Sequence, residues 1–313
     1  MLADLRYAFR LIAHNPGFSA AAILTMTLGI GMTTAIFSVV DAVLLRPIPF
    51  PDPERLVMVW ETDRDSGTTH EPASYPDFRD FQQRSRRVDR FAAVIAGETS
   101  LTPERGDPVR LASLTVTHDF LPLLGVHPLV GRGLTADDER VGGPQVVLIS
   151  EGLWDRVFLR DPNVVGRTLR RDDRPQTVIG VVPRGADFGV LQILSAADYG
   201  RGFADRDART EVDVWSPLQA DADILPRDTH PALLIGRLAP GASVASAQED
   251  LAGIAADLER TFPSNTARGV FVEPLPDVIF GPIEPALLVL AAGVGLVLLI
   301  SCVNVANLLL ARG

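Results

Sequence analysis

Histidine, cysteine and carboxylate side chains carry most protein chemistry, and none is spaced here as a catalytic or metal site requires. Acidic runs at 137–139 and 172–173 occur among turn-forming residues, where solvated loop charge is a simpler interpretation than an acid–base pair. The histidines lack the helical spacing and the cysteine partners of a zinc site. They are His14, His70, His118, His127 and His230. We therefore predict no catalytic and no metal-binding residues.

Nucleophile and nucleotide motifs are also missing from the sequence. It contains no Gly-x-Ser-x-Gly elbow and no Walker A loop. The Gly29-Ile30-Gly31 run lacks the preceding strand and the third glycine of a dinucleotide fingerprint. We expect a protein that is not an enzyme and binds no cofactor.

Composition excludes further classes. The net charge is −10, and no Lys/Arg stripe with interleaved aromatic residues is present, so we expect no nucleic acid partner. Cys302 is the only cysteine, which rules out an internal disulfide. Its simplest role is that of a small apolar residue at a helix interface.

Two uncharged apolar runs, 15–40 and 285–311, bracket the chain. Each exceeds the about 20 residues that a transmembrane helix needs, and the first is too long for the core of a signal peptide. The first run is rich in glycine, alanine, serine and threonine, which predicts close packing against another helix. In the second run, Asn304 and Asn307 either bond between helices, which we favour, or line a wet path.

The positive charges near the termini predict the orientation. Arg6, Arg10 and Arg312 place both ends in the cytoplasm, so an even number of spans leaves the middle outside. Apolar residues at helical spacing before Asn15 predict a short amphipathic helix on the inner membrane surface.

The middle alternates strand-like and helix-like segments. Residues 74–77 read as a capping box, Ser150 as the cap of another helix, and 244–262 as an amphipathic helix with Ser243 as cap and Pro263 as stop. Residues 189–212 read as a surface loop. The strand-helix-strand patterns at both ends of the middle predict one subdomain made from both flanks.

We therefore expect an α+β periplasmic domain of two mixed α/β subdomains, one inserted in the other, flanked by two transmembrane α-helices. The expected boundaries are an interfacial helix over 1–16, the first span over 17–45, the core domain over 46–282 with an inserted subdomain at about 116–227, the second span over 283–311, and the start of a cytoplasmic segment at 312–313.

Short phrases along the whole chain resemble the MacB/FtsX family of ABC transporter permeases, and more narrowly its acidobacterial-type duplicated permeases. The phrases are SYPDF at 74–78, LLGV at 123–126, GR at 131–132, VVLIS at 146–150 followed by LW at 153–154, VGRTL at 165–169, VIGVVP at 178–183, WSPL at 215–218, GRLAPG at 236–241 and NVANLLLAR at 304–312.

The resemblance implies a permease component of an ABC-type system for efflux or lipoprotein handling. Its external MacB-like core domain would couple helix motion, driven by a separate ATPase, to the periplasm. The implied setting is the bacterial inner membrane, in a multi-pass protein that is in contact with lipid and paired with a second permease copy. Because the family's coupling segment would begin at Gly313, we expect either a fragment of a longer permease or a truncated reading frame, and we favour the fragment.

An alternative with the same topology is a two-span membrane sensor with an extracytoplasmic ligand-binding domain. A membrane-anchored hydrolase is a third interpretation.

On the permease hypothesis, the proline-rich exit from the first span, 46–53, is a stiff root that transmits displacement to the domain.

Overall fold

The computed structural model describes residues 16–40, 48, 50–102, 108–186, 211–281 and 284–310. The chain divides into two compact units: Met1–Pro47 with Phe280–Gly313 form unit 1, and Ile48–Ile279 form unit 2. The surface helix expected over 1–16 and the loop expected over 189–212 fall almost entirely outside the described residues.

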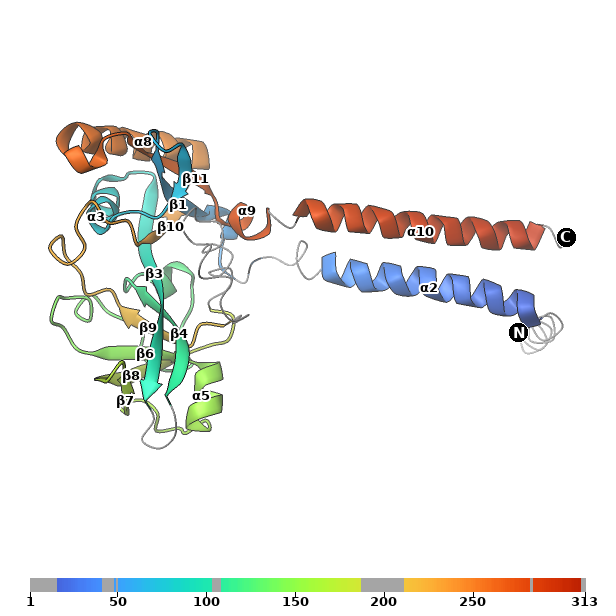
Figure 1. The fold of residues 1–313 in the computed structure, drawn as a ribbon, viewed down its shortest axis with the longest axis horizontal. Coiled ribbons are helices and arrows are strands. Elements are labelled where there is room, and N and C mark those ends of the chain that lie inside the picture. Colours follow the sequence, from blue (N-terminus) through green and yellow to red (C-terminus); the bar gives the residue numbers. More distant parts are fainter. Residues whose placement is uncertain are drawn as a thin grey trace. The chain divides into compact units, whose positions relative to one another are not determined.

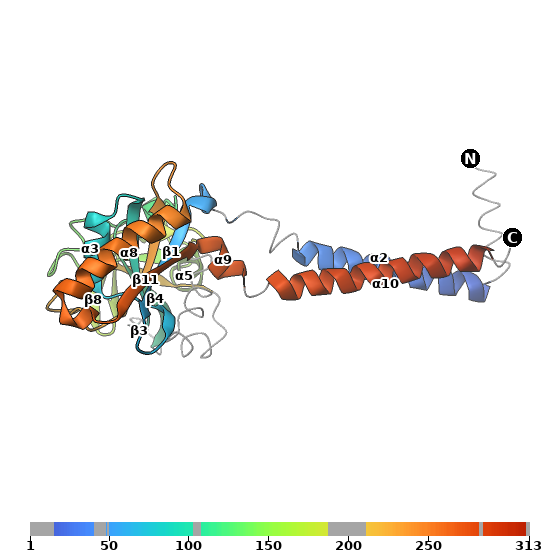
Figure 2. The ribbon, with the colours of Figure 1, turned by 90° about the horizontal axis from the view of Figure 1, so that it is seen from above.

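The described part of unit 1 is a pair of helices, α2 (Pro16–Val40) and α10 (Glu284–Leu310), which lie side by side (Figures 1 and 2). They approach closely at Gly29, where an added Cβ atom would lie 3.0 Å from the hydroxyl oxygen of Ser301. Ser301 is buried, and its hydroxyl donates to the carbonyl of Val297 in its own helix. The prediction that small residues in the first apolar run permit close helix packing is therefore confirmed.

The two helices differ in their capacity to cross a membrane. Within α10, the 19 residues Pro285–Val303 are long and apolar enough to do so. The apolar part of α2 among the described residues, Ile23–Ser38, is shorter than this requirement. One of the two expected spans therefore meets the criterion in the described part of the chain. Cys302 is exposed on α10, so the interface expected for it is not formed with α2.

Unit 2 is built on an 11-stranded sheet with strand order β11-β1-β10-β3-β4-β9-β6-β8-β5, in which β2 also pairs with β1, and β7 with β3 and β8. The strands are β1 (Leu56–Asp63), β2 (Thr68–Glu71), β3 (Val88–Thr102), β4 (Val109–Val116), β5 (Val130–Gly131), β6 (Val146–Ser150), β7 (Thr168–Arg171), β8 (Arg174–Val182), β9 (Val214–Pro217), β10 (Leu233–Leu238) and β11 (Arg268–Pro274).

Helices cover this sheet. They are α3 (Tyr75–Arg84), α4 (Phe120–Leu123), α5 (Glu151–Phe158), α8 (Val244–Thr261) and α9 (Leu275–Phe280), with short 3-10 turns η2 (Pro53–Arg55) and η3 (Pro263–Asn265). The predicted serine caps are present: the Ser150 hydroxyl accepts the Leu153 N–H, and Ser243 forms a reciprocal capping box with Ser246.

The long strand β3 joins two halves of unit 2. Its first part pairs with β10 and its second part with β4 and β7. Because β4 leads through β9, β6 and β8 to β7, and β7 returns to β3, these strands close into a ring. Figure 1 shows β3 running from the half that carries α3 and α8 to the half that carries α5.

Each half has its own apolar core. In the first half, α3 and α8 pack their apolar faces against the sheet, around Phe78, Phe81 and Leu251. In the second half, α5 packs Leu153 against residues of the strand ring such as Val178. The predicted mixed α/β class is confirmed. Strand β1, near the start of unit 2, pairs with β10 and β11, near its end.

Gly131 permits a close contact between β5 and β8. It has a positive φ of 82°, and an added Cβ atom would collide with the backbone of Ile179 and Gly180. Gly142, in the same half, has a similar φ of 75° but open space around it. Comparison of Gly131 with Gly142 therefore separates the effect of backbone strain from the effect of steric overlap.

We predict that Gly131→Ala destabilises the protein by more than about 2 kcal/mol, because left-handed strain adds to a steric overlap that the sheet cannot relieve. Gly142→Ala carries the strain alone and should cost only about 1 kcal/mol. Unfolding of the two variants in urea measures the difference, and equal losses would contradict the assigned β5–β8 contact.

Candidate functional site

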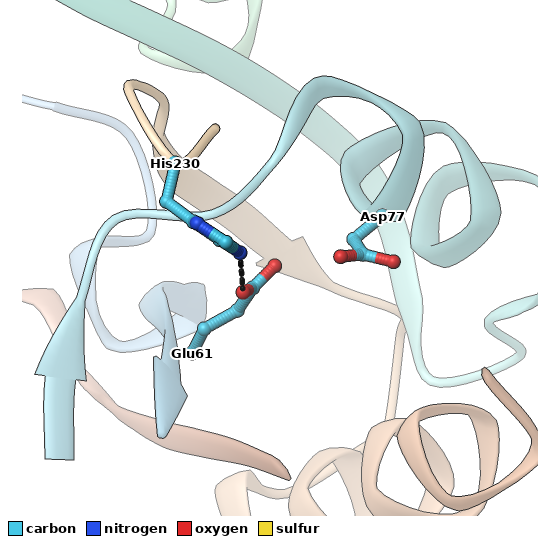
Figure 3. A group of neighbouring side chains, drawn as sticks. All are labelled: Glu61, Asp77 and His230. Carbon is cyan, nitrogen blue, oxygen red and sulfur yellow. Dashed lines mark ion pairs between the residues drawn. The ribbon is translucent and has the colours of Figure 1, made fainter. Parts of the chain in front are cut away.

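A buried polar cluster lies in the first half of unit 2, where three distant segments meet (Figure 3). Glu61 comes from β1, Asp77 from the first turn of α3, and His230 from the loop before β10. Glu61 is 2% exposed and Asp77 is 1% exposed. Glu61 Oε2 and His230 Nε2 are 3.2 Å apart, at ion-pair distance but without the alignment of a hydrogen bond.

Glu61 completes the cap of α3. The Ser74 hydroxyl accepts the Asp77 N–H at 3.1 Å, as the sequence predicts. The reciprocal half of the expected capping box is different, because the Ser74 N–H donates to Glu61 Oε1 at 3.1 Å instead of to Asp77. A carboxylate from β1 thereby fixes the start of α3.

Asp77 is thus free to hold other segments. Its carboxylate accepts the Ser74 hydroxyl and the side-chain amide of Asn265, and it forms an ion pair with Arg227. Arg227 also donates to Asp80 at 2.7 Å, and its guanidinium lies 4.0 Å from the centre of the Phe262 ring. The cluster therefore links α3, the loop before β10, and the end of α8.

The charge balance of this cluster favours neutral Glu61. Burial is the main cause that raises the pKa of Glu61 from its ordinary 4.5 to about 7; contact with His230 opposes the rise, and the nearby Asp77 charge adds to it. Below that pH Glu61 keeps its proton, and the charge on Asp77 is compensated by Arg227.

Metal binding fits this group poorly. The ligand atoms of Glu61, Asp77 and His230 lie within 4.8 Å of one another, as a metal site requires. However, both oxygens of Asp77 already accept hydrogen bonds, and the Arg227 cation touches one of them. A second cation there would compete with Arg227, so the group acts as a tie between segments.

A second feature anchors the start of unit 2 to its sheet. The Arg237 guanidinium, on β10, donates to the carbonyls of Leu123 and Pro51, at 2.8 and 2.9 Å. Pro51 also packs against Gly125, where an added Cβ atom would lie 2.6 Å from the proline ring. The described part of the proline-rich root is therefore fixed to β10 and to α4; Pro47 and Pro49 lie outside the described residues.

The other acidic and histidine residues singled out by the sequence have structural surroundings. Asp138 pairs with Arg132 and accepts hydrogen bonds from Thr135; these contacts, the Arg132 bond first, lower its pKa. The Asp172 carboxylate accepts bonds from Thr99 and Ser100.

The histidines are likewise separated. His118 pairs with Glu139, whose hydrogen bond raises the histidine pKa. His70 contacts the rings of Trp60 and Phe271 edge-on, and His127 is exposed. Only His230 joins the cluster, and His14 is outside the described residues. Sequence spacing could not reveal the cluster, because long-range strand pairing brings residues 61, 77 and 230 together.

The sequence of this chain matches a known protein family. Residues 19–254 match the family model of the MacB-like periplasmic core domain. This chain belongs to that family. The family resemblance seen in the sequence is thus confirmed, and the first half, the strand ring and the buried cluster are parts of a MacB-like core domain.

Solved structures show the same fold. A domain of a putative permease protein from Porphyromonas gingivalis superposes with a TM-score of 0.51 at 18% identity, covering 72% of this chain and 92% of that one. The periplasmic region of MacB from Actinobacillus actinomycetemcomitans gives 0.51 at 14% identity, covering 74% and 92%. A search of curated protein sequences returned no match.

The raised pKa of Glu61 predicts how the stability of this MacB-like domain depends on pH. Between pH 4.5 and about 7 the unfolded chain loses the Glu61 proton while the folded chain keeps it, so stability falls as pH rises through this window. Glu61→Gln removes that loss. Relative to the natural protein, the variant should gain about 3 kcal/mol between pH 4.5 and 7.5.

Urea unfolding at several pH values, followed by tryptophan fluorescence, to which buried Trp60 and Trp215 contribute, measures this gain. Glu71→Gln is the matched control, because Glu71 is equally buried but forms an ion pair with Arg268. It should destabilise the domain at every pH, by roughly 1–3 kcal/mol. A stability difference between Glu61→Gln and the natural protein that does not change with pH would contradict the proposed charge balance.

Proposed function

We propose that this chain is a non-enzymatic permease component of an ABC-type export or mechanotransmission system in the bacterial inner membrane. The match of residues 19–254 to the MacB-like periplasmic core domain carries the proposal. In it, 17–45 and 283–311 are membrane spans, unit 2 is periplasmic, and a separate ATPase supplies the energy. A second permease copy and membrane lipid complete the assembly.

The entry and exit of unit 2 support a role in transmitting motion. Strands β1 and β11 pair directly from Val57↔Pro274 to Asp63↔Arg268, so the first and last strands of the unit are hydrogen-bonded neighbours. Strand β11 continues directly into α9, whose residues Leu275, Val278 and Ile279 are buried. A displacement of either end therefore reaches the same part of the sheet.

Strand pairing also connects β1 and β11 to the second half of unit 2. Strand β10 lies beside β1 and pairs with β3, which runs on into the strand ring. Arg237 holds the Pro51 carbonyl to β10, so the root is tied to the sheet at Pro51. In our proposal unit 2 moves as a lever. Efflux or lipoprotein handling takes place at the strand ring, the part of unit 2 that is furthest along the sheet from β1 and β11.

The topology predicts which parts of the chain are accessible from the periplasm. In a Cys302→Ala background, which removes the only cysteine, we expect Asp137→Cys to react with a membrane-impermeant maleimide in cells whose outer membrane alone has been opened. Gly313→Cys should react only after the inner membrane is permeabilised. Asp137 is 75% exposed, so its accessibility is set by the compartment. The reverse labelling pattern would exclude the proposed orientation.

The lever predicts that a flexible root disconnects ATP hydrolysis from motion of unit 2. Replacing Pro47, Pro49 and Pro51 together by glycine should leave ATP hydrolysis by the assembled complex intact but abolish the nucleotide-dependent change in distance between spin labels on residue 137 of the two copies. Pro240→Gly, at an exposed turn of unit 2, is the matched control and should keep the change. An undiminished change in the triple variant would refute the lever.

A further inference from the structure

The interior of the strand ring changes from apolar to polar along its length. Eight ring residues form the core of its apolar part, namely Leu101, Leu111, Val147, Ile149, Leu169, Val178, Val181 and Val214. Side chains two residues apart on a strand lie on the same face. Two residues from Leu169, Val178 and Val214, toward one end of the ring, these faces carry Arg171, Gln176 and Ser216. These three line a cavity of about 240 Å³ at the polar mouth of the ring.

Arg171 is an unusual lining residue because its charge is not compensated. Its guanidinium donates to the Ser216 hydroxyl at 2.6 Å, and no carboxylate of the described residues lies within ion-pair distance of it. Asp172, the nearest charge, is occupied by Thr99 and Ser100. Burial lowers the pKa of Arg171, as expected for a cation that has lost water without gaining an anion.

Gln176 supplies an independent observation. Its side chain is 6% exposed, and its Oε1 atom is buried without a hydrogen-bond partner, although it lines the same cavity. A buried carbonyl oxygen without a donor costs about 1–3 kcal/mol. The wall of the cavity therefore holds a cation with unused N–H donors and, in a neighbouring residue, a buried acceptor without a donor.

The remaining walls limit the size and shape of a ligand. Leu218, Ile224 and Leu225 supply an apolar side to the cavity. Its volume is below the about 300–1,000 Å³ that is typical of drug-sized ligands. A guanidinium fork suits a carboxylate, which accepts two parallel N–H bonds.

We propose that the polar mouth of the strand ring binds a small organic carboxylate with a hydroxyl donor and a short branched apolar group. The carboxylate pairs with Arg171, the hydroxyl donates to Gln176 Oε1, and the apolar group lies against Leu218, Ile224 and Leu225. This site is separate from the buried Glu61 cluster, and the proposal does not depend on whether the chain works as a permease.

Calorimetric titration of the full chain in a non-ionic detergent tests the proposal with three related probes. We expect 2-hydroxy-4-methylpentanoate to bind. Loss of the hydroxyl, in 4-methylpentanoate, should weaken binding by about tenfold, since one hydrogen bond in a buried site is worth about 1.4 kcal/mol. Loss of the charge, in 2-hydroxy-4-methylpentanamide, should abolish it. Equal binding of the acid and the amide, or no binding of the hydroxy acid at about 10 mM, ten times a Kd of about 1 mM, overturns the proposal.

Variants assign the binding to the named side chains. Arg171→Met should abolish binding, and Arg171→Lys should weaken it by tenfold or more because the fork is lost. Arg170→Met is the matched control, since Arg170 is the exposed neighbour on β7 and the charge change is identical. Gln176→Leu should remove the preference for the hydroxy acid over 4-methylpentanoate.

Thermal unfolding without ligand distinguishes binding from a structural role. If Arg171 is kept for a ligand, Arg171→Met removes an uncompensated, half-buried cation and should leave the midpoint unchanged or raise it by roughly 2–4 °C. A lowered midpoint together with unchanged probe binding would assign Arg171 to structure and overturn the proposal.

Discussion

Strand β3 is the element on which both halves of unit 2 depend. Its residues up to Val94 pair with β10 in the first half, and those from Val94 to Thr102 pair with β4 and then β7 in the ring. A single backbone thus belongs to two cores, each of which would leave one edge of its sheet unpaired without it. Because ladder hydrogen bonds resist sliding, the halves are joined by a stiff strand and not by a linker. A domain that passes displacement along its length needs such a joint.

Local patterns in the sequence predicted the local parts of this fold. The helix ending before Pro263 and the caps at Ser150 and Ser243 follow from residue types a few positions apart. Ring closure and the Glu61 cluster depend on pairings between distant segments, which no local period encodes. Two signals were nevertheless present. Glu61 directly follows the apolar run of β1, and Arg171 stands two residues after buried Leu169 on the same face of β7. A charged residue at an inward position of a strand is a local sign of a buried polar site.

One expectation was changed by a physical cause outside its own segment. The capping box at 74–77 lost its reciprocal bond because Glu61, brought close by β1, accepts the Ser74 N–H and releases Asp77 to hold Arg227. Among the described residues, the apolar part of α2 is shorter than a span, although its small residues do pack against α10. Hydropathy and packing are separate properties of a helix, and for α2 the packing is confirmed in the described residues.

The two buried polar groups of unit 2 differ in how completely their charges are balanced. Both carboxylate oxygens of Asp77 have donors, and the cation that touches Asp77 also bridges to Asp80, so the charge on Asp77 is balanced. Around Arg171 the balance is incomplete, with one hydroxyl bond to a cation and an orphaned amide oxygen beside it. If stability alone determined these residues, apolar side chains would be expected at the polar mouth. Apolar side chains do fill the adjacent interior of the ring. The persistence of an uncompensated charge on Arg171, in a domain where the charge on Asp77 is paired, is therefore better explained by a ligand than by the folding of the domain.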